Sequence, residues 1–126
     1  MQQTGQEFLV ACLCAQWCGA CREYRPAFEA LATAFPDTRF AWVDVEDEPD
    51  VAGDIDIDNF PTLVIQRGAS VVFCGPMLPH ISQLERLLQT LMAQTPEESR
   101  ALLASPQRQA WQSVGDVRSR LDERRS

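Results

Sequence analysis

A nearly continuous apolar run, EFLVACLCA (residues 7–15), leads after two residues into a Cys-x-x-Cys, and this junction constrains the fold more than any other part of the chain. Such a short apolar run is typical of a strand buried on both faces of a sheet. Residues 21–35 then carry apolar side chains at steps of three and four, which predicts a helix. These side chains are Tyr24, Phe28, Leu31 and Phe35. Four of the five cysteines therefore lie where a buried strand turns into a helix.

The following segments continue this alternation of strands and helices. RFAWVDVED (39–47) predicts a second strand, and TLVIQ (62–66) and SVVFC (70–74), separated by three residues, predict a hairpin. LPHISQLERLLQTLMAQ (78–94) has the spacing of an amphipathic helix, and Pro26 should kink the first helix. The order β-α-β-(short α)-β-β-α predicts an α/β sandwich in which helices flank a central mixed sheet.

The sequence changes character after residue 94. TPEE (95–98) has the pattern of a capping box, and SPQRQAWQSV (105–114) begins with a second Ser-Pro helix start. A modest apolar stripe runs on past Gly115, a residue that weakens a helix interior by roughly 1 kcal/mol. We therefore divide the 126-residue chain into an α/β domain, 1–94, and a C-terminal helical extension, 95–126, with two helices.

The charge distribution disfavours nucleic acid as a partner. The net charge is −7, and residues 1–96 hold five Arg against thirteen Asp and Glu. Such an acidic body repels phosphate backbones. No stretch reaches the ~18 apolar residues of a membrane span. LVAC (9–12) resembles a lipoprotein cleavage box, but no Lys or Arg precedes it, which disfavours a signal peptide and favours a cytoplasmic protein.

Two kinds of chemistry compete for the four clustered cysteines. In a zinc site made of all four thiols, one strand and the turn after it would have to supply every ligand. Structural zinc sites normally take two pairs of ligands from separate loops. Cys12 and Cys14 alternate on the strand and share one face, and we expect the strand to keep them away from the Cys-x-x-Cys turn. A metal site therefore stays a minor alternative.

The redox interpretation uses only Cys18 and Cys21. Cys18 is expected at the N-terminus of the helix, where free N–H groups and the helix dipole favour an anion, and the thiolate is the nucleophile of thiol chemistry. Cys21 follows one helical turn later and can close a disulfide with Cys18. Cys12, Cys14 and Cys74 occur in apolar strands and are predicted to be core residues. Cys14 is the best candidate for an accessory redox-sensitive thiol because it is nearest the turn.

At WCGAC (17–21) the chain resembles the thioredoxin family, over roughly Phe8 to Met92. Trp17 directly precedes the first cysteine, and Pro26 lies where the family has its kinking proline. FPT (60–62) opens the third strand, where the family has a cis-proline, and Gly75 lies where the family has a glycine beside its substrate groove.

The resemblance implies a thioredoxin-like fold with Pro61 in the cis form, and a protein thiol–disulfide oxidoreductase. Cys18 would attack a client disulfide and Cys21 would resolve the mixed disulfide. The implied partners are disulfide-containing client proteins and an electron-donating reductase, and no cofactor or metal is needed beyond a redox-active Cys18–Cys21 disulfide. The substrate groove would be formed by Trp17, Gly19, Ala20, Phe60, Pro61, Thr62 and Gly75.

Several positions depart from the family pattern. The turn is Gly19-Ala20 where the family has Gly-Pro, Cys12 replaces a buried acid, Trp42 its lysine partner, and Cys14 a strand tryptophan. Only seven residues precede Phe8, so most of the family's first strand and helix is missing, and the C-terminal helices are candidates to cover the exposed surface. These departures leave an alternative function: an interaction or chaperone-like module that docks a partner through its C-terminal helices, with secondary redox activity.

Overall fold

A computed structural model describes residues 7–53, 55, 57, 59–78 and 80–123. The order of elements up to residue 93 is the one predicted from the sequence. The strands are β1 (Phe8–Cys14), β2 (Arg39–Asp44), β3 (Thr62–Arg67) and β4 (Ser70–Pro76). The helices of this part are α1 (Gly19–Ala34), α2 (Pro49–Ala52) and α3 (Ile81–Ala93). They are followed by α4 (Pro96–Leu102), α5 (Pro106–Trp111), the 3₁₀ turn η2 (Gln112–Val114) and α6 (Val117–Glu123).

The four described strands form one mixed sheet in the order β2-β1-β3-β4. β1 runs parallel to β2 and antiparallel to β3, and β3 and β4 form the predicted antiparallel hairpin. Gly68 in the hairpin turn has a φ of +61°, a conformation that glycine adopts without strain. Because β1 has a partner on each side and helices over both faces, every one of its seven residues is buried.

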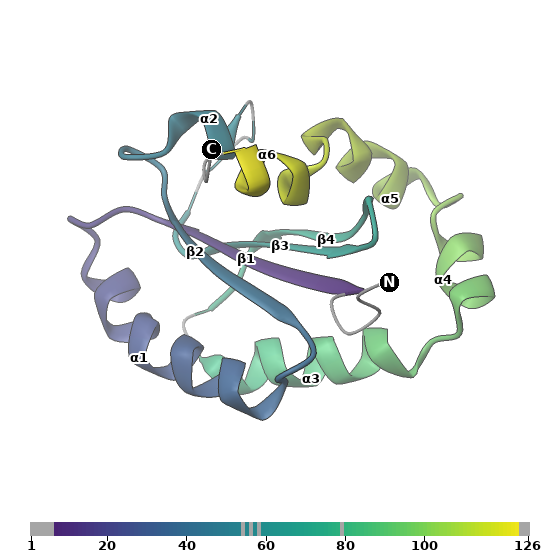
Figure 1. The fold of residues 1–126 in the computed structure, drawn as a ribbon, viewed down its shortest axis with the longest axis horizontal. Helices are drawn as coiled ribbons and strands as arrows, with labels where there is room; N and C mark the ends of the chain where they lie inside the picture. The colour runs from purple at the N-terminus through teal and green to yellow at the C-terminus, as the bar shows by residue number, and fades with distance from the viewer. Residues whose placement is uncertain (1–6, 54, 56, 58, 79, 124–126) are drawn as a thin grey trace.

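Helices α1 and α3 cover one face of the sheet (Figure 1). The apolar spacing predicted for α1 is confirmed, since Tyr24, Phe28 and Leu31 are buried against this face, and Pro26 lies inside the continuous helix. From β1 the even-numbered residues face this layer. They are Phe8, Val10, Cys12 and Cys14. The two strand cysteines therefore share one face, as the alternation predicted.

The other face is covered by α2, α5 and α6 (Figure 1). Here Leu9, Ala11 and Leu13 of β1 lie in one core with Val117 and Leu121 of α6, both completely buried. Trp111 of α5 contacts Phe73 of β4 with ring centroids 5.4 Å apart. The C-terminal helices thus form a layer of the fold, which confirms the expectation that they cover sheet surface.

The helices after residue 94 differ in number from the prediction. The capping box is confirmed, because the Thr95 hydroxyl accepts from Glu98 N and Thr95 N donates to the Glu98 carboxylate. However, the segment predicted as a second helix is interrupted by η2 and by Gly115, which has a φ of +85°. With a ψ of −172°, this is a backbone conformation that residues with a Cβ rarely adopt, so glycine ends the helix here and a separate α6 begins at Val117.

Two glutamine side chains join the C-terminal helices to the sheet. Gln66 of β3 is fully buried and accepts from Val117 N at 2.6 Å while donating to Asp116 Oδ1 at 2.9 Å. Gln112 binds the backbone of Val71 on the edge strand β4, accepting from its N–H at 2.9 Å and donating to its carbonyl at 2.7 Å. These contacts satisfy groups that would otherwise be buried without partners.

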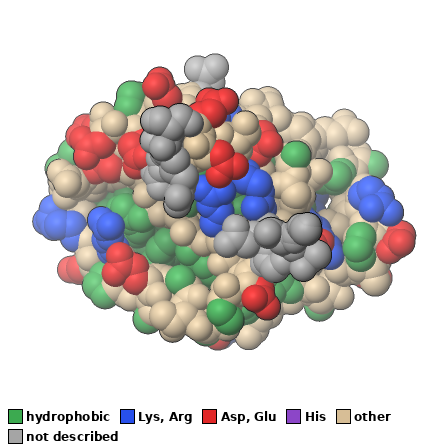
Figure 2. Space-filling view, in the orientation of Figure 1, with side chains coloured by type: hydrophobic (Ala, Val, Ile, Leu, Met, Phe, Trp, Pro, Cys, Tyr) green, Lys and Arg blue, Asp and Glu red, His purple; other side chains and the backbone are tan. Residues whose placement is uncertain are grey.

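Arginine and acidic side chains are interspersed on the face shown in Figure 2, and hydrophobic side chains reach the surface beside them. Within the described part of the chain, no helix is long and apolar enough to cross a membrane.

Candidate functional site

Cys18 is placed at the start of α1, as the sequence predicted. It is the N-cap residue, with an extended backbone (φ −84°, ψ 117°), and its carbonyl accepts the first helical hydrogen bond from Arg22 N at 3.2 Å. Its thiol is free and its side chain is partly exposed. The Cys18 side chain makes no capping hydrogen bond to the first turn of α1, so its sulfur is not engaged by the helix that presents it.

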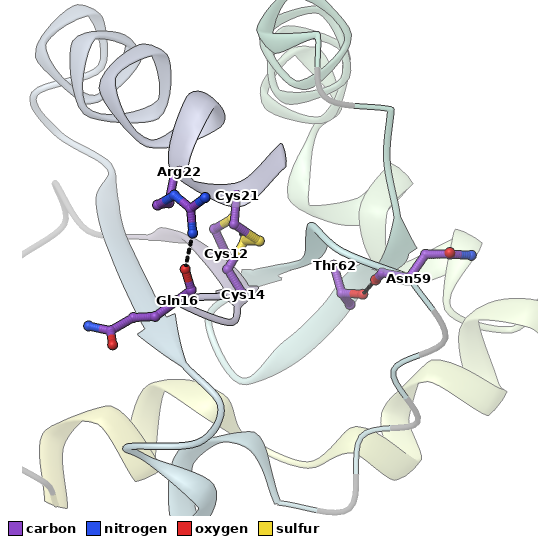
Figure 3. Close-up of a disulfide and its surroundings, with 7 residues drawn as sticks. All are labelled: Cys12, Cys14, Gln16, Cys21, Arg22, Asn59 and Thr62. Carbon is purple, nitrogen blue, oxygen red and sulfur yellow. Dashed lines mark hydrogen bonds between the residues drawn. A yellow bond between two sulfur atoms is a disulfide. The ribbon is translucent and has the colours of Figure 1, made fainter. Parts of the chain in front are cut away.

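Cys21 has a different partner from the one predicted. In the structure it forms a disulfide with Cys14, at the end of β1, and the two Cα atoms are 5.8 Å apart (Figure 3). Both side chains are only 1% exposed. The expected Cys18–Cys21 disulfide is therefore not the one present, and Cys14 is more than a core residue.

The expectation that the strand keeps Cys14 away from the turn was wrong. Residues 15–18 reverse the chain so tightly that the first turn of α1 packs directly over the end of β1. Cys14 faces this helix because alternate residues of a strand point to the same side, and Val10 and Cys12 point there too. Cys21 faces the sheet from α1. Alternation along β1 places Cys14 on the face toward α1, and helical spacing places Cys21 on the side of α1 that faces the sheet. Both patterns are needed to predict this contact, and the strand pattern alone does not reveal it.

Cys12 lies beneath the disulfide. Its Sγ is 3.8 Å from Cys14 Sγ, and because Cys14 is bonded to Cys21, the only proton between the two atoms belongs to Cys12. Burial raises the pKa of the Cys12 thiol far above its ordinary value. The pKa of the neighbouring Tyr24 is also raised, first by burial and then by Cys12, and its hydroxyl has no hydrogen-bond partner among the described residues. Cys12 and Tyr24 are therefore neutral.

The turn between β1 and α1 is braced by an arginine. Arg22 Nη1 donates to the Gln16 carbonyl at 2.7 Å, across the loop that presents Cys18 (Figure 3). Gly19 and Ala20 form the first residues of α1, and a Cβ on Gly19 would meet Arg22 Nη2 at an ordinary 3.9 Å. Sterics in this turn therefore do not demand glycine at residue 19.

The aromatic pair predicted to frame the groove is in contact. The rings of Trp17 and Phe60 are 5.6 Å apart and nearly perpendicular, at 81°. Trp17 is 64% exposed, and its Nε1 donates to Glu46 Oε2 at 3.0 Å. The Phe60–Pro61 bond is cis, as the resemblance implied. This contact brings the loop before β3 beside the loop before α1.

The remaining groove candidates lie on the strand pair β3 and β4. Thr62 follows the cis-proline, is buried, and donates from its hydroxyl to Asn59 O at 2.6 Å (Figure 3). Gly75 pairs with Leu63 in the ladder, and Met77 N donates to the Pro61 carbonyl at 3.1 Å. A shallow hollow of about 420 Å³ adjoins this region. It is lined by Asn59, Phe60, Pro76, Met77 and Leu78.

Other candidate groups lie apart from this site. Among the residues described, no three His, Cys, Asp or Glu side chains are grouped to hold a metal ion. Cys74 lies in β4 and contacts the opposite core, with its thiol pKa raised by burial. His80 is the N-cap residue of α3, makes no side-chain capping hydrogen bond and is exposed.

Comparison with known proteins places these features in a family. A putative thioredoxin 2 of Streptomyces coelicolor is 40% identical over 73 residues, covering 58% of this chain and 54% of that protein. Thioredoxin H2 of Arabidopsis thaliana is 39% identical over 66 residues, covering 52% and 50%. This chain thus spans about half the length of these curated relatives.

Solved structures give the same result. The thioredoxin of Fasciola hepatica matches with a TM-score of 0.62 and 30% identity, over 70% of this chain and 83% of that one. Oxidised mitochondrial thioredoxin 3 of Saccharomyces cerevisiae matches with a TM-score of 0.61 and 28% identity, over 71% and 83%. The thioredoxin family model matches residues 1–89. The match covers more than half of the sequence and includes the cis-proline and the cysteine-bearing start of α1. The chain therefore belongs to the thioredoxin family.

Proposed function

We propose that this protein is a thiol–disulfide oxidoreductase that reduces disulfides of client proteins. The observation that carries the proposal is Cys18, a partly exposed free thiol at a helix N-terminus beside the exposed Trp17. Family membership supports the same activity. Reduced protein, with Cys14 and Cys21 as thiols, would be the form that starts the reaction.

The proposed reaction is two successive thiol–disulfide exchanges. The Cys18 thiolate attacks one sulfur of the client disulfide, and the other client sulfur leaves as a thiolate. The Cys21 thiolate then attacks Cys18 Sγ, which releases the second client thiolate and leaves a Cys18–Cys21 disulfide. A reductase returns two electrons and two protons, so the chain itself needs no bound cofactor or metal.

The groove is proposed to hold the client segment. Trp17 and Phe60 would flank it, Gly19 and Ala20 would allow close approach to Cys18, and Pro61 to Thr62 would offer backbone groups to an extended chain. Gly75 and the hollow around Met77 would extend this surface. Trp17 is 64% exposed, and an aromatic contact from it to a client side chain would be worth about 0.5–1.5 kcal/mol, so Trp17→Ala should lower kcat/KM for a protein disulfide by roughly two- to tenfold.

The contacts of the C-terminal helices bear on the alternative function. Val117 and Leu121 of α6 face the sheet and are buried in its core, so these apolar side chains are not free for docking. A role as an interaction module is therefore not favoured. We propose that clients and a reductase are the partners, and that the chemistry runs in the reducing environment of the cytoplasm.

Insulin reduction with dithiothreitol as electron donor tests the proposal. Cys18→Ser should abolish turnover, and Cys21→Ser should accumulate a mixed disulfide with the client that is visible on a non-reducing gel. Cys74→Ser, on the opposite core, is the matched control and should keep turnover. Wild-type turnover in Cys18→Ser would contradict the assignment.

A further inference from the structure

We infer that Cys14 is a third redox-active thiol, and that Cys21 exchanges its disulfide partner between the accessible Cys18 and the buried Cys14. The inference deepens the proposed function and rests on it. It starts from the disulfide itself, which joins Cys21 to Cys14 while Cys18 remains a free thiol.

The geometry brings both partners to Cys21. Cys14 lies on the strand face that α1 covers, with its Cα 5.8 Å from the Cα of Cys21. Cys18 lies three residues earlier on the same helix start, a spacing that puts Cβ atoms about 5–6 Å apart. One sulfur therefore lies between an accessible thiol and a buried one.

The exchange conserves disulfides and electrons. After a client has been reduced, the Cys14 thiolate attacks Cys21 Sγ, the Cys18–Cys21 bond breaks, and Cys18 leaves as a thiolate. The proton of Cys14 passes to solvent, and the protein still carries the same single disulfide. The disulfide has moved from the Cys18–Cys21 pair, which includes the accessible Cys18, to the Cys14–Cys21 pair, in which both residues are only 1% exposed.

This movement changes what the oxidised protein can do. Cys18 becomes a free nucleophile again, but Cys21 is no longer available to resolve a new mixed disulfide. An external reductant reaches the buried bond through the reverse exchange, in which Cys18 attacks Cys21 and releases Cys14. The Cys14–Cys21 disulfide is therefore a stored, resting form of the oxidised protein.

Peptide mapping can identify the disulfide directly. Reduced wild-type protein is mixed with oxidised dithiothreitol, quenched at intervals with acid, alkylated, and cut with chymotrypsin, which cleaves after Trp17 and Tyr24. A Cys18–Cys21 bond leaves peptide 18–24 bridged within itself. A Cys14–Cys21 bond links that peptide to the one ending at Trp17, with Cys18 alkylated.

The bridged peptide should appear first and give way to the linked one. Cys14→Ser should lose the linked peptide completely, whereas Cys12→Ser and Cys74→Ser should keep it, which separates Cys14 from its neighbour at 3.8 Å. Cys18→Ser should still reach the linked form, but about tenfold or more slowly, because buried thiols react slowly with an external oxidant.

Two results would overturn the inference. One is wild-type protein that holds only the bridged peptide at equilibrium, and the other is Cys18→Ser that forms the linked peptide as fast as wild type. The first test uses wild-type protein and the second uses Cys18→Ser, so both remain valid even if the Cys14→Ser variant does not fold. If either result is found while wild-type protein still turns over insulin and Cys18→Ser does not, the proposed function stands without the third thiol. If wild-type turnover is absent, the proposed function itself fails.

Discussion

Replacing Gln66 by methionine should destabilise the protein by about 2–3 kcal/mol, although methionine has nearly the same volume. Gln66 is completely buried in β3, and its side chain is the hydrogen-bonded joint between the sheet and α6. Asp116 Oδ1 keeps a second donor, Ser119 N at 3.3 Å, when the amide is removed. The Val117 N–H, at the start of α6, would lose the bond at 2.6 Å in a completely buried residue.

The magnitude follows from these two kinds of loss. Leaving one buried donor without a partner costs about 1–3 kcal/mol, and each lost hydrogen bond whose partner finds a substitute costs about 0.5–1.5 kcal/mol. With a urea m-value of about 2 kcal/mol/M, the unfolding midpoint should fall by about 1–1.5 M. The assay is urea unfolding followed by circular dichroism, with a reductant present so that disulfides do not contribute.

Gln83→Met is the matched control because Gln83 is exposed on α3. It should leave the midpoint within about 0.2 M of wild type. The same small shift in Gln66→Met would refute the reasoning, since it would mean that α6 contributes little to the cooperative unfolding of the sheet. It would also restore the possibility that the C-terminal helices separate from the sheet to bind a partner.

Two further predictions concern a turn and the buried thiols. Gly115→Ala should destabilise the protein by more than Gly68→Ala in the same urea assay. Both glycines have a positive φ, which costs alanine about 1 kcal/mol or more, but Gly115 combines φ +85° with ψ −172°, a region almost exclusive to glycine. A Cβ on Gly115 would also lie 2.9 Å from Arg120 Nη1, in a guanidinium that the Val51 and Val114 carbonyls hold in place, whereas a Cβ on Gly68 would meet nothing within 4 Å. Equal losses would contradict this. The raised pKa of Cys12 means that the folded protein holds this proton after the unfolded chain has released it, so stability should fall as pH rises above about 9, and in reduced protein Cys12→Ala should flatten that fall between pH 8 and 10. An unchanged slope in Cys12→Ala would show that other groups cause it.

The elements of the fold could be predicted because each has a local signal. The buried strand, the capping box at Thr95 and the hairpin turn at Gly68 depend on residues close in sequence. The break at Gly115 was missed because a helical apolar stripe continues across it, and only the positive φ and the position of Arg120 show that the chain turns there. The role of Gln66 was also hidden, since its partners lie some fifty residues away.

The site shows the same limit more sharply. Cys18, Trp17, Phe60 and Pro61 could be proposed from a motif and a resemblance, and the structure brings the aromatic pair together. The Cys14–Cys21 bond depends on how closely α1 packs over β1, which no motif encodes. Predicting this bond requires combining the two-residue repeat of the strand with the 3.6-residue repeat of the helix. It also requires knowing that the turn between them is short enough to place the first turn of α1 over the end of β1.

The central strand β1 separates the cysteine-bearing face of the sheet from the face that the C-terminal helices cover. Even-numbered residues of β1 meet α1 and end at the disulfide, whereas Leu9, Ala11 and Leu13 meet α2 and α6. Because strand side chains alternate, substitutions on one face leave the other face's contacts in place. The layer over the face toward α6 combines α2 with residues after 110, while the thiol-bearing face contacts the cysteine-bearing start of α1. A change in the helices that cover one side therefore need not move Cys18, because the thickness of one strand separates the disulfide from the layer that contains α6.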